Sequence, residues 1–549
     1  MNARSSAAVM LVLGALIALP AAAGPDTLTI LHLNDTHSFL APTGPRTPDL
    51  HGTFGGIARV ATLLEKERLR DPNALFLHAG DFSIGDPVFA KYLGVPELRL
   101  LALLGLDAMA VGNHEFDLTS AMLGRVLDSA VVGVRLFPLL SSNLRLPDST
   151  VAALARYIKP LACRTAGNVK VGFFALTTPE ANLESRPAPA FLDTALAPVA
   201  AAMVDSLRAE GCRVIICLSH LGLAHDLQLA RTVPGITLIV GGHDHATLFQ
   251  PRSVVDKRGR TTWIVQAGSF YRYLGKLRLV VEGGRTRLMS YELIPVRRGI
   301  PEEPAVRKAV EEIVGGVEAT YGPMYHQRVA TAVAPISEEA GSLAAPGSHD
   351  TPMGNLVADA LRAVTGTQIA MVPCGLTAQQ FYRGPILPVD VFRAVGYGFN
   401  TENGLGYRLT TFRMTGTAIC RGLEFGLSQF EQGDEYLIQV SGMKYTYDAG
   451  KAPFSRLKRV SVGGKPIDPS GWYTVTANEY VTMFLNTLGI PYSDGRVLGD
   501  TTQYHALLGY VTKCGTLTPL IEGRVVNESG AGVRDAGLRS RSRRNPQQP

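Results

Sequence analysis

Cysteine is scarce in this chain, and the features of a membrane protein or a nucleic-acid-binding protein are also missing. The 549 residues include six cysteines, and none has the close spacing of a structural zinc site. After the N-terminal region there is no stretch of about twenty uninterrupted apolar residues, so no stable membrane span is expected there. The net charge is only +6, from 53 basic and 47 acidic side chains, so the composition calls for no nucleic-acid partner.

The two ends of the chain differ in composition from the rest of the sequence. Arg4 precedes an apolar run over residues 7–20, and the small residues up to Ala23 suit a cleavage site. We therefore expect residues 1–23 to be a signal peptide, cleaved near Ala23, and the mature protein to be periplasmic or secreted. Retention as an N-terminal anchor is the alternative. Residues 527–549 are rich in Arg, Ser, Gly and Gln, which predicts a disordered basic tail.

The spacing of the cysteines does not indicate a disulfide framework. Cys212 and Cys217 flank one apolar stretch and lie five residues apart, which would place them on opposite faces of a strand. That arrangement argues against a bond between these two residues. We expect mostly buried thiols among Cys163, Cys212, Cys217, Cys374, Cys420 and Cys514.

The first half of the chain alternates short apolar segments with amphipathic ones. This alternation predicts stacked sheets flanked by helices, with ligands gathered at the carboxyl ends of the strands. Strands 263–267 and 275–281 are expected to close this part. The clearest pairs of strand and helix are 27–33 with 57–70, 74–78 with 95–105, and 214–218 with 224–232.

A chain of this length is too long for one core, so two domains are expected. Residues 302–320 have the pattern of a charged amphipathic helix between two prolines, which suits a connector. The part after it reads as α+β, with a helix over 354–365 and strands near 456–462 and 472–477. The predicted division is a signal peptide over 1–23, a first domain over 24–300, a connector over 301–325, a second domain over 326–526 and a tail over 527–549.

Side chains that bind metal ions follow five of the predicted strands. Carboxylate, imidazole and amide groups of this kind suit zinc, manganese and similar ions. The outer residues of two motifs are two positions apart, so extended backbone would direct both side chains to the same side. The motifs are Asp35-Thr36-His37, Gly80-Asp81, Gly112-Asn113-His114-Glu115-Phe116-Asp117, Ser219-His220 and Gly241-Gly242-His243-Asp244-His245.

Each motif taken alone is weak evidence. An Asp-x-His tripeptide often caps a turn, and His220 by itself is more typical of a core or surface histidine. Five such motifs in order at strand ends indicate a two-metal site. Asp81, alone after an apolar run, is the natural bridge between cations about 3.5–4 Å apart.

Together the five motifs resemble the signature of the calcineurin-like metallophosphoesterases, in the branch of the 5′-nucleotidases and UDP-sugar hydrolases. The resemblance implies a four-layer α/β metallophosphoesterase domain built on a β-sandwich, followed by an α+β C-terminal substrate-binding domain. Further segments that carry it are Leu31-His32-Leu33-Asn34, Gly55-Gly56-Ile57-Ala58-Arg59, Gly354-Asn355-Leu356-Val357-Ala358-Asp359-Ala360, Met414-Thr415-Gly416, Leu423-Glu424 and Val440-Ser441-Gly442-Met443.

The resemblance also implies roles for the motif residues. His114 would face the scissile phosphate, and Asp117 would orient it and raise its pKa. A hydroxide bridging two divalent ions, zinc, manganese or similar, would be the nucleophile, without a covalent phosphoenzyme. The implied ligands are Asp35, His37, Asp81 and His245 for one metal, and Asp81, Asn113, His220 and His243 for the other.

The substrate-binding positions depart from the family pattern. Gly347 and Thr377 stand where nucleotidases usually carry an arginine, so two guanidinium contacts to substrate are missing unless another arginine replaces them. Tyr397 occupies the first base-stacking position. The remaining substrate-contact predictions are Asn355, Phe399 and Phe484, and for each aromatic residue a purely structural place in the core is equally compatible with the sequence. The possible replacement arginines are Arg362, Arg383 and Arg393.

The sequence thus predicts an exported two-metal phosphoesterase that hydrolyses nucleotides or related phosphate esters, as in nucleotide catabolism. One alternative is the same centre acting on a sugar phosphate, a cyclic phosphate or a thiosulfate-type ester. Another is a binding protein that has lost catalysis. That second alternative would predict damaged ligands, whereas all seven are intact.

Overall fold

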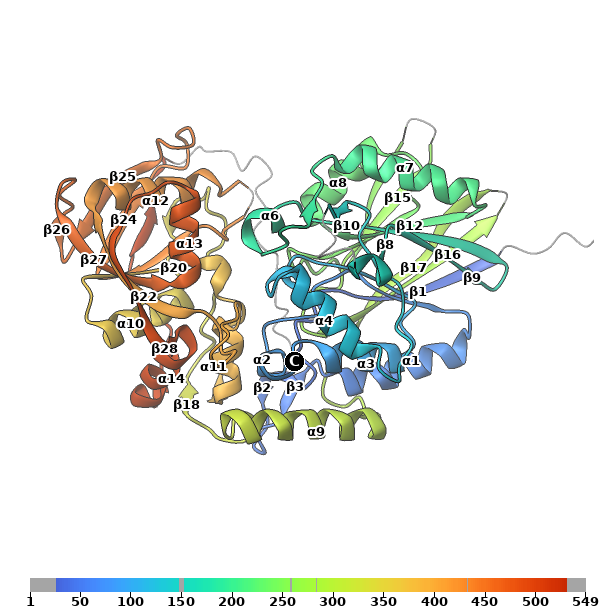
Figure 1. Cartoon of the computed structure of the whole chain (residues 1–549), viewed down its shortest axis with the longest axis horizontal. Coiled ribbons are helices and arrows are strands. Elements are labelled where there is room, and N and C mark those ends of the chain that lie inside the picture. Colours follow the sequence, from blue (N-terminus) through green and yellow to red (C-terminus); the bar gives the residue numbers. More distant parts are fainter. Residues whose placement is uncertain (1–25, 148–152, 257–258, 283, 432, 531–549) are drawn as a thin grey trace, which may run out of the picture.

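The computed structural model describes residues 26–147, 153–256, 259–282, 284–431 and 433–530. The predicted signal peptide and most of the predicted tail lie outside these residues. Two domains lie side by side, and helix α9 (Pro304–Tyr321) runs beneath them where the chain passes from one to the other (Figure 1). Among the described residues, no helix combines the length and the apolar character needed to cross a lipid bilayer.

The first domain is built on two large sheets. One sheet has the order β17 (Arg285–Pro295), β16 (Tyr273–Glu282), β1 (Asp26–Leu33), β4 (Leu75–His78), β5 (Ala108–Ala110), β6 (Leu139–Leu140) and β8 (Ile158–Lys159). The other has the order β14 (Arg252–Val255), β15 (Thr261–Val265), β13 (Leu238–Gly241), β12 (Val214–His220), β10 (Val169–Thr177) and β9 (Leu161–Ala166). Short pairs are formed by β2 (Thr43–Arg46) with β3 (Gly52–Phe54) and by β7 (Leu144–Arg145) with β11 (Phe191–Leu192).

Strand β12 shows how the layers arise from alternation. Val214 and Ile216 pack in the core between the two sheets, whereas Ile215 and Cys217 face the opposite side. There they meet α7 (Leu196–Ala209) and α8 (Leu223–Thr232). The first sheet is covered on its outer face by α1 (Ile57–Arg70), α3 (Val95–Leu103) and α4 (Ser120–Ala130). The order helix, sheet, sheet, helix confirms the predicted four-layer domain.

Parallel pairing brings the strand ends to one edge. Strands β1, β4, β5 and β6 run parallel in the first sheet. Strands β10, β12, β13 and β15 run parallel in the second. Their carboxyl ends therefore lie together, and the loops that leave them carry the metal-ligand motifs.

Two expectations about this domain are wrong in detail. The strands expected over 263–267 and 275–281 do not close the domain, because β17 follows them and pairs with β16 as the edge strand. Most residues of β17 are exposed or half-buried, so it lacks the apolar signal of a core strand. Cys212 and Cys217 do not face opposite sides either. Cys212 precedes β12 and packs in the same cluster as Cys217.

The second domain is α+β, as predicted. Its main sheet has the order β23 (Ile438–Ser441), β20 (Ile369–Pro373), β27 (Trp472–Asn478), β22 (Arg408–Thr415) and β28 (Ser493–Thr502). A second sheet has the order β19 (Gly347–Ser348), β30 (Val525–Asn527), β24 (Met443–Tyr447), β25 (Leu457–Val462) and β26 (Lys465–Pro466), and a small one joins β21 (Gly384–Ile386), β18 (Ala330–Ala332) and β29 (Thr516–Leu517). The helices are α10 (Pro352–Thr365), α11 (Pro388–Val395), α12 (Gly416–Ser428), α13 (Glu479–Thr487) and α14 (Gln503–Cys514).

The two domains share a continuous apolar contact. One cluster of buried side chains runs from Leu33 and Phe76 in the first domain to Phe381 and Leu507 in the second. Helix α9 contacts both α1 and α2 (Pro87–Tyr92). The edge of the first domain that carries the candidate metal ligands faces the second domain, and one pocket is lined by residues of both.

Candidate metal centre and adjoining pocket

The metal-ligand motifs lie in turns and not in extended backbone. The φ angle is +50° at Asp35 and at His37, +83° at His243 and +54° at His245. The two-residue spacing therefore does not work through alternation along a strand, and that expectation is wrong. A left-handed backbone aims these side chains inward instead. Asp81 has the same conformation, with φ of +56°.

The first group of ligands comes together behind the loop after β1. His37 Nε2 lies 3.0 Å from His245 Nε2 and 3.9 Å from Asp81 Oδ2. Asp35 Oδ1 lies 3.8 Å from His245 Nε2. Asp35, His37 and His245 are buried and placed so that they could hold a metal ion.

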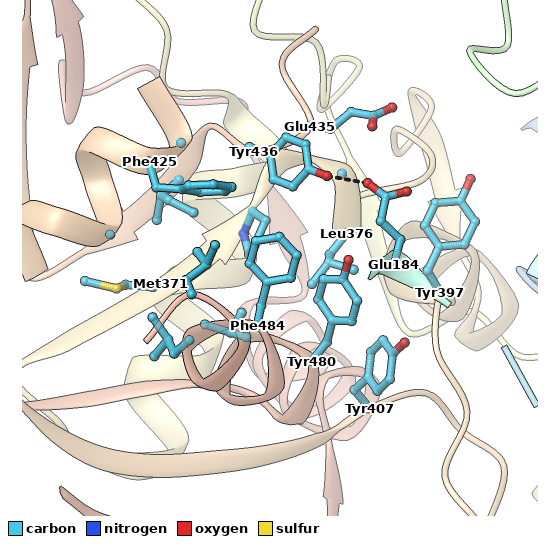
Figure 2. Close-up of a pocket in the computed structure, with 18 of the residues that line it drawn as sticks. Glu184, Met371, Leu376, Tyr397, Tyr407, Phe425, Glu435, Tyr436, Tyr480 and Phe484 are labelled. Carbon is cyan, nitrogen blue, oxygen red and sulfur yellow. Dashed lines mark hydrogen bonds between the residues drawn. The ribbon is translucent and has the colours of Figure 1, made fainter. Parts of the chain in front are cut away.

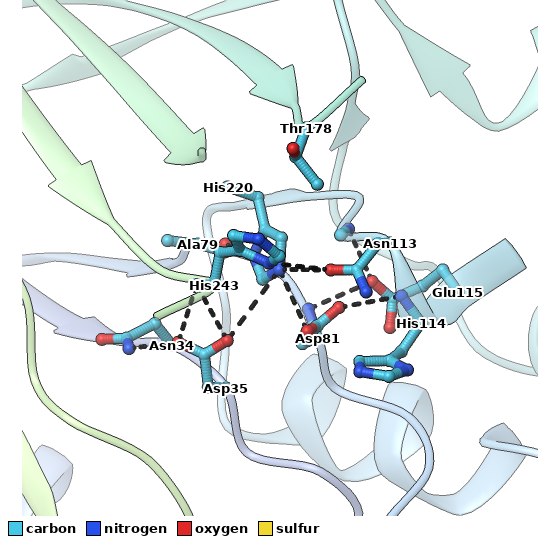
Figure 3. Close-up of polar contacts among 12 residues, drawn as sticks. Asn34, Asp35, Ala79, Asp81, Asn113, His114, Glu115, Thr178, His220 and His243 are labelled. Atoms are coloured by element: carbon cyan, nitrogen blue, oxygen red, sulfur yellow. Dashed lines mark hydrogen bonds and ion pairs between the residues drawn. The ribbon is translucent and has the colours of Figure 1, made fainter. Parts of the chain in front are cut away.

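The second group lies beside Asp35, as Figure 3 shows. His220 Nε2 is 3.0 Å from Asp81 Oδ2 and 3.1 Å from Asn113 Oδ1. His243 Nδ1 is also 3.1 Å from Asn113 Oδ1. Asp35 Oδ1 reaches within 3.9 Å of His220 Nε2, and Asp35, Asp81 and His220 form a second set that could hold an ion. The structure thus brings together all seven side chains that the sequence singled out.

Hydrogen bonds made by the histidine rings determine which ring nitrogen is available to bind a metal ion. His220 Nδ1 donates to the Ala79 carbonyl at 2.7 Å, so its Nε2 is the nitrogen that faces Asp81 Oδ2 and Asn113 Oδ1. Burial alone would lower the pKa of this ring, but Asp81 outweighs it and raises the pKa, so without a metal ion the imidazolium pairs with this carboxylate. A divalent cation can replace that proton among the same three atoms, so the donor set fits a bound metal.

His37 fits in the same way. Its Nδ1 lies 3.2 Å from the Ser83 carbonyl and donates to it, which leaves Nε2 facing His245. Burial lowers the pKa of His37 to about 3, so the ring is neutral. Neutral imidazole is the form that binds metal ions.

Glu115 ties the loops after β4 and β5 together. Its carboxylate accepts hydrogen bonds from the backbone N–H groups of Asp81, Phe82, Ser83 and Gly112, at 3.1, 3.1, 3.2 and 2.6 Å. The Ser83 hydroxyl donates to it as well, at 2.8 Å. The sequence interpretation gave Glu115 no role. A carboxylate inside a loop of ligands could have suggested one, because a buried carboxylate needs several donors.

Glu180 is a second residue that sequence reasoning missed. Its Oε2 lies 3.2 Å from His243 Nε2, so it holds the far side of the ring whose Nδ1 faces Asn113. Glu180 follows Thr177, where β10 ends at the same edge as the other ligand-bearing strands. Its position just after the end of a sixth strand is the sequence feature that could have indicated a role for Glu180.

His114 stands beside the ligands and pairs with Asp117. Its Nδ1 lies 2.7 Å from Asp117 Oδ2, and Asp117 Oδ1 accepts from the Ser185 hydroxyl at 2.8 Å. Burial alone would lower the pKa of His114, but the carboxylates of Asp117 and Asp81 outweigh it and raise the pKa to about 10. The ring of Tyr397 stacks on His114 with centroids 5.0 Å apart.

Comparison with known proteins places the chain. Residues 28–247 match the calcineurin-like phosphoesterase family, and residues 329–485 match the 5′-nucleotidase C-terminal domain. The chain belongs to the 5′-nucleotidase family of calcineurin-like phosphoesterases. It is therefore a hydrolase that acts on phosphoric esters.

Relatives match this phosphoesterase over nearly its whole length. A 5′-nucleotidase precursor from Thermus thermophilus has 29% identity and a TM-score of 0.80, covering 91% of this chain and 99% of that one. The 5′-nucleotidase of Bos taurus is 27% identical over 567 residues, which covers 96% of this chain and 95% of that protein. The snake venom 5′-nucleotidase of Gloydius brevicauda is 27% identical over 544 residues, covering 93% and 91%.

A pocket lies between the candidate metal centre and the second domain. Figure 2 shows its aromatic walls and two of its carboxylates. Asn113, His114, Asp117, His243 and His245 line it at the metal end. Its other walls are mainly aromatic and aliphatic. They include Met371, Leu376, Tyr397, Tyr407, Met414, Ile419, Leu423, Phe425, Tyr436, Tyr480, Phe484, Leu485, Leu488 and Ile490.

The structure separates the four predicted substrate-contact residues. Tyr397 and Phe484 line the pocket, whereas Asn355 and Phe399 are not among its described lining residues. Asn355 is buried and donates to Asp350 Oδ2 at 2.8 Å. Phe399 packs edge-on against Phe89.

The structure also shows where the positions of the missing family arginines and of their possible replacements lie. Thr377 is buried and its hydroxyl donates to the Cys374 carbonyl at 2.8 Å, while Gly347 lies on the exposed short strand β19. Arg393 is buried in an ion pair with Asp86. Within the described chain, none of the three replacement arginines lines the pocket, so no guanidinium takes over the missing contacts.

Proposed function

We propose that this phosphoesterase binds two divalent cations and hydrolyses 5′-nucleotides or related phosphate monoesters. The single observation that carries the proposal is the convergence of seven candidate ligand side chains, with His220 Nε2 and Asp81 Oδ2 facing each other at 3.0 Å. The relatives named 5′-nucleotidase support nucleotides as the first substrate class to test. The signal-peptide pattern and the venom relative support export.

We assign the ligands as the sequence predicted. Zinc, manganese or a similar ion suits these donors. When bound, such ions polarise the phosphoryl group and activate a water as nucleophile. Asp35, His37, Asp81 and His245 would hold one ion, and Asp81, Asn113, His220 and His243 the other. Asp81 would be shared because its Oδ2 lies near both His37 and His220.

His114 and Asp117 act on the ester itself. Asp117 holds the Nδ1 side of the ring, so the imidazolium can direct Nε2–H toward the pocket. A cation there stabilises the charge that develops on the phosphoryl oxygens and can protonate the leaving oxygen. Glu115 and Glu180 position ligands and touch no substrate.

A phosphate-release screen of the purified chain tests this function. We expect release from nucleoside monophosphates or other monoesters, loss of activity on exhaustive chelation, and recovery with zinc or manganese. Sugar phosphates, cyclic nucleotides and UDP-sugars belong in the same screen. Full activity in protein shown by metal analysis to be metal-free would contradict the proposal. Absence of activity on every ester, with both metals bound, would favour a binding protein.

A further inference from the structure

Five aromatic rings form one wall of the pocket. Their centroids are 5.5 Å apart for Tyr407 and Tyr480, 5.9 Å for Tyr480 and Phe484, and 5.7 Å for Tyr436 and Phe484. Phe425 adds a fifth ring at 5.6 Å from Phe484. A planar base clamped between two rings would need them about 7 Å apart, twice the usual contact distance. These rings touch one another, so they form a wall and not a clamp.

Two carboxylates stand at the end of this wall. Glu184, from α6 (Ala181–Glu184) of the first domain, accepts a hydrogen bond from the Tyr436 hydroxyl across the domain boundary (Figure 2). Glu435 lines the same pocket next to Tyr436. Burial and the neighbouring charge of Glu435 raise the pKa of Glu184 to about 7. Two acidic groups thus crowd each other at a site of low polarity.

No lysine or arginine is found among the residues that line the described pocket. The positive groups at the metal end would be matched by the phosphate of a substrate. Along the aromatic wall, negative charge and electron-rich ring faces stand together. This combination attracts a cation, because an ammonium group binds both to carboxylates and to the faces of aromatic rings.

We infer that the wall of Tyr407, Tyr436, Tyr480 and Phe484 with Glu184 and Glu435 binds a positively charged group on the substrate's alcohol. The preferred substrates are then phosphate monoesters of short alcohols that carry a quaternary ammonium group. This inference rests on the proposed function, because it names the substrate class of the same active site.

Glu184 lies close to the candidate metal centre. Glu180 contacts the metal-ligand candidate His243 at 3.2 Å, and Glu184 follows it by one helical turn. This proximity favours a short alcohol between the phosphate and the ammonium group. The aliphatic side chains beyond the rings, such as Ile419 and Leu488, would contact the alkyl groups on nitrogen.

A matched pair of substrates tests the charge alone. Phosphocholine and 3,3-dimethylbutyl phosphate have the same shape, but the second has carbon in place of the charged nitrogen. We expect kcat/KM for phosphocholine to exceed that for the neutral ester by about ten- to thirtyfold, the scale of a desolvated cation–π contact. Equal values would overturn the inference, and so would a strong preference for AMP over phosphocholine.

Variants of the wall should remove the preference. Glu184→Gln and Glu435→Gln keep shape and remove charge, and Tyr480→Leu removes one ring face. Each should lower the ratio of kcat/KM for the charged over the neutral ester. Glu312→Gln, on the exposed side of α9, is the matched control and should leave the ratio unchanged. An unchanged ratio in all three wall variants would contradict the inference.

Binding without turnover separates this inference from the proposed function. Choline and 3,3-dimethylbutanol can be compared by calorimetry with the folded wild-type chain. Tighter binding of choline, weakened in Glu184→Gln, would support the cation site even if no ester were hydrolysed. Hydrolysis of esters without any preference for choline would sustain the function and reject the site.

A second inference rests on a different observation, the approach of Cys163 to Cys212. Their Sγ atoms are 3.2 Å apart, although the residues are 49 positions apart in sequence. Cys163 lies on β9 opposite Gly172 of β10, and a Cβ added at Gly172 would meet Cys212 Sγ at 3.0 Å. The geometry points to a disulfide between these two residues when the chain meets a small-molecule disulfide oxidant. Both thiols then lose a proton and an electron, one S–S bond forms, and the oxidant is reduced to two thiols.

Alkylation of the unfolded protein tests this bond. After exposure of the folded chain to oxidised glutathione and removal of excess oxidant, four of the six cysteines should react with iodoacetamide, because two are in the bond. Peptide mapping should join Cys163 to Cys212. The oxidised chain should also show a higher urea midpoint, since the crosslink restricts the unfolded state. Cys163→Ser is the control and should show no such increase. Six reactive thiols, or a glutathione adduct in place of the crosslink, would overturn the assignment.

Discussion

Arg393 of the second domain and Asp86 of the first form an ion pair that is fully buried at the domain boundary. Arg393 Nε lies 2.7 Å from Asp86 Oδ2, and both side chains are 0% exposed. The guanidinium also donates to the carbonyls of Ala41 and Pro42 and lies over the ring of Phe39. An arginine that the sequence offered as a substrate ligand is instead a structural link between the domains.

Removing one partner of this pair should destabilise the chain strongly. Arg393→Met leaves Asp86 buried with its charge unpaired, which typically costs about 3–5 kcal/mol. Urea unfolding measures the loss. The double variant Asp86→Asn with Arg393→Met should regain much of it, and a double variant as unstable as the single one would contradict this account.

Metal content should respond differently to two ligand substitutions. Asp81→Asn should reduce occupancy of both sites because Asp81 Oδ2 lies near His37 and near His220. His245→Asn should empty mainly the site that contains His37. Metal analysis after dialysis provides the measurement. Equal stoichiometry in the two variants would show that Asp81 is not shared.

Substitution of His114 should damage catalysis and spare the metals. His114→Asn should lower kcat by roughly 10²–10⁴, the usual scale for a proton-transferring or charge-stabilising group. Asp117→Asn should act in the same direction but less, because the ring remains in place. Metal loss in His114→Asn would instead identify His114 as a ligand.

Nucleotide affinity should be weak. No guanidinium lines the described pocket, and one charge-assisted contact is commonly worth about 1.5–3 kcal/mol. We expect the KM for AMP to exceed that of relatives that carry these arginines. Thr377→Arg should not restore affinity but should lower the urea midpoint, since Thr377 is 1% exposed. A lower KM for AMP with an unchanged midpoint would show that the loop can present an arginine to substrate.

Stability should fall with rising pH because of Glu97. Burial raises the pKa of this α3 carboxyl to about 7, above its ordinary value of 4.5. The folded state therefore holds a proton that the unfolded state has lost, so stability is greatest below the unfolded pKa and declines as pH rises toward the folded one. Glu97→Gln should remove this decline, changing the difference in unfolding free energy between pH 5 and pH 8 by about 2 kcal/mol. Parallel urea curves of both proteins at the two pH values provide the check.

Local patterns predicted the layers of the fold well. The helix over 57–70 has the expected bounds, and the strand expected over 27–33 begins only one residue earlier, because both have strong apolar patterns. The edge strand β17 escaped detection because it buries little. The bounds of helices and strands follow from the local sequence. Whether a strand lies at the edge of a sheet depends on which other segments pack against it.

The candidate site also combines features that local sequence predicts with features that depend on tertiary contacts. The seven candidate ligands, which the structure brings together, were named from motifs at strand ends and from the family resemblance. Glu115 and Glu180 stand next to sequence signals, but their partners could not be predicted, because the loops that they join meet only in the folded chain. The residues that line the pocket could not be predicted from sequence either. Phe399 and Phe484 look alike in sequence, and only Phe484 lines it.

The left-handed turns at the metal centre also restrict how descendants of this chain could lose it. At Asp35, His37, Asp81 and His245 the backbone conformation is one that asparagine, aspartate and glycine tolerate and β-branched residues do not. A mutation to valine or isoleucine there would disturb the fold as well as the chemistry, whereas asparagine or glycine would silence the centre and leave its loops in place. Inactive copies are therefore expected to arise first through asparagine and glycine, and a β-branched residue at any of these positions would mark a lineage whose loops had already been rebuilt.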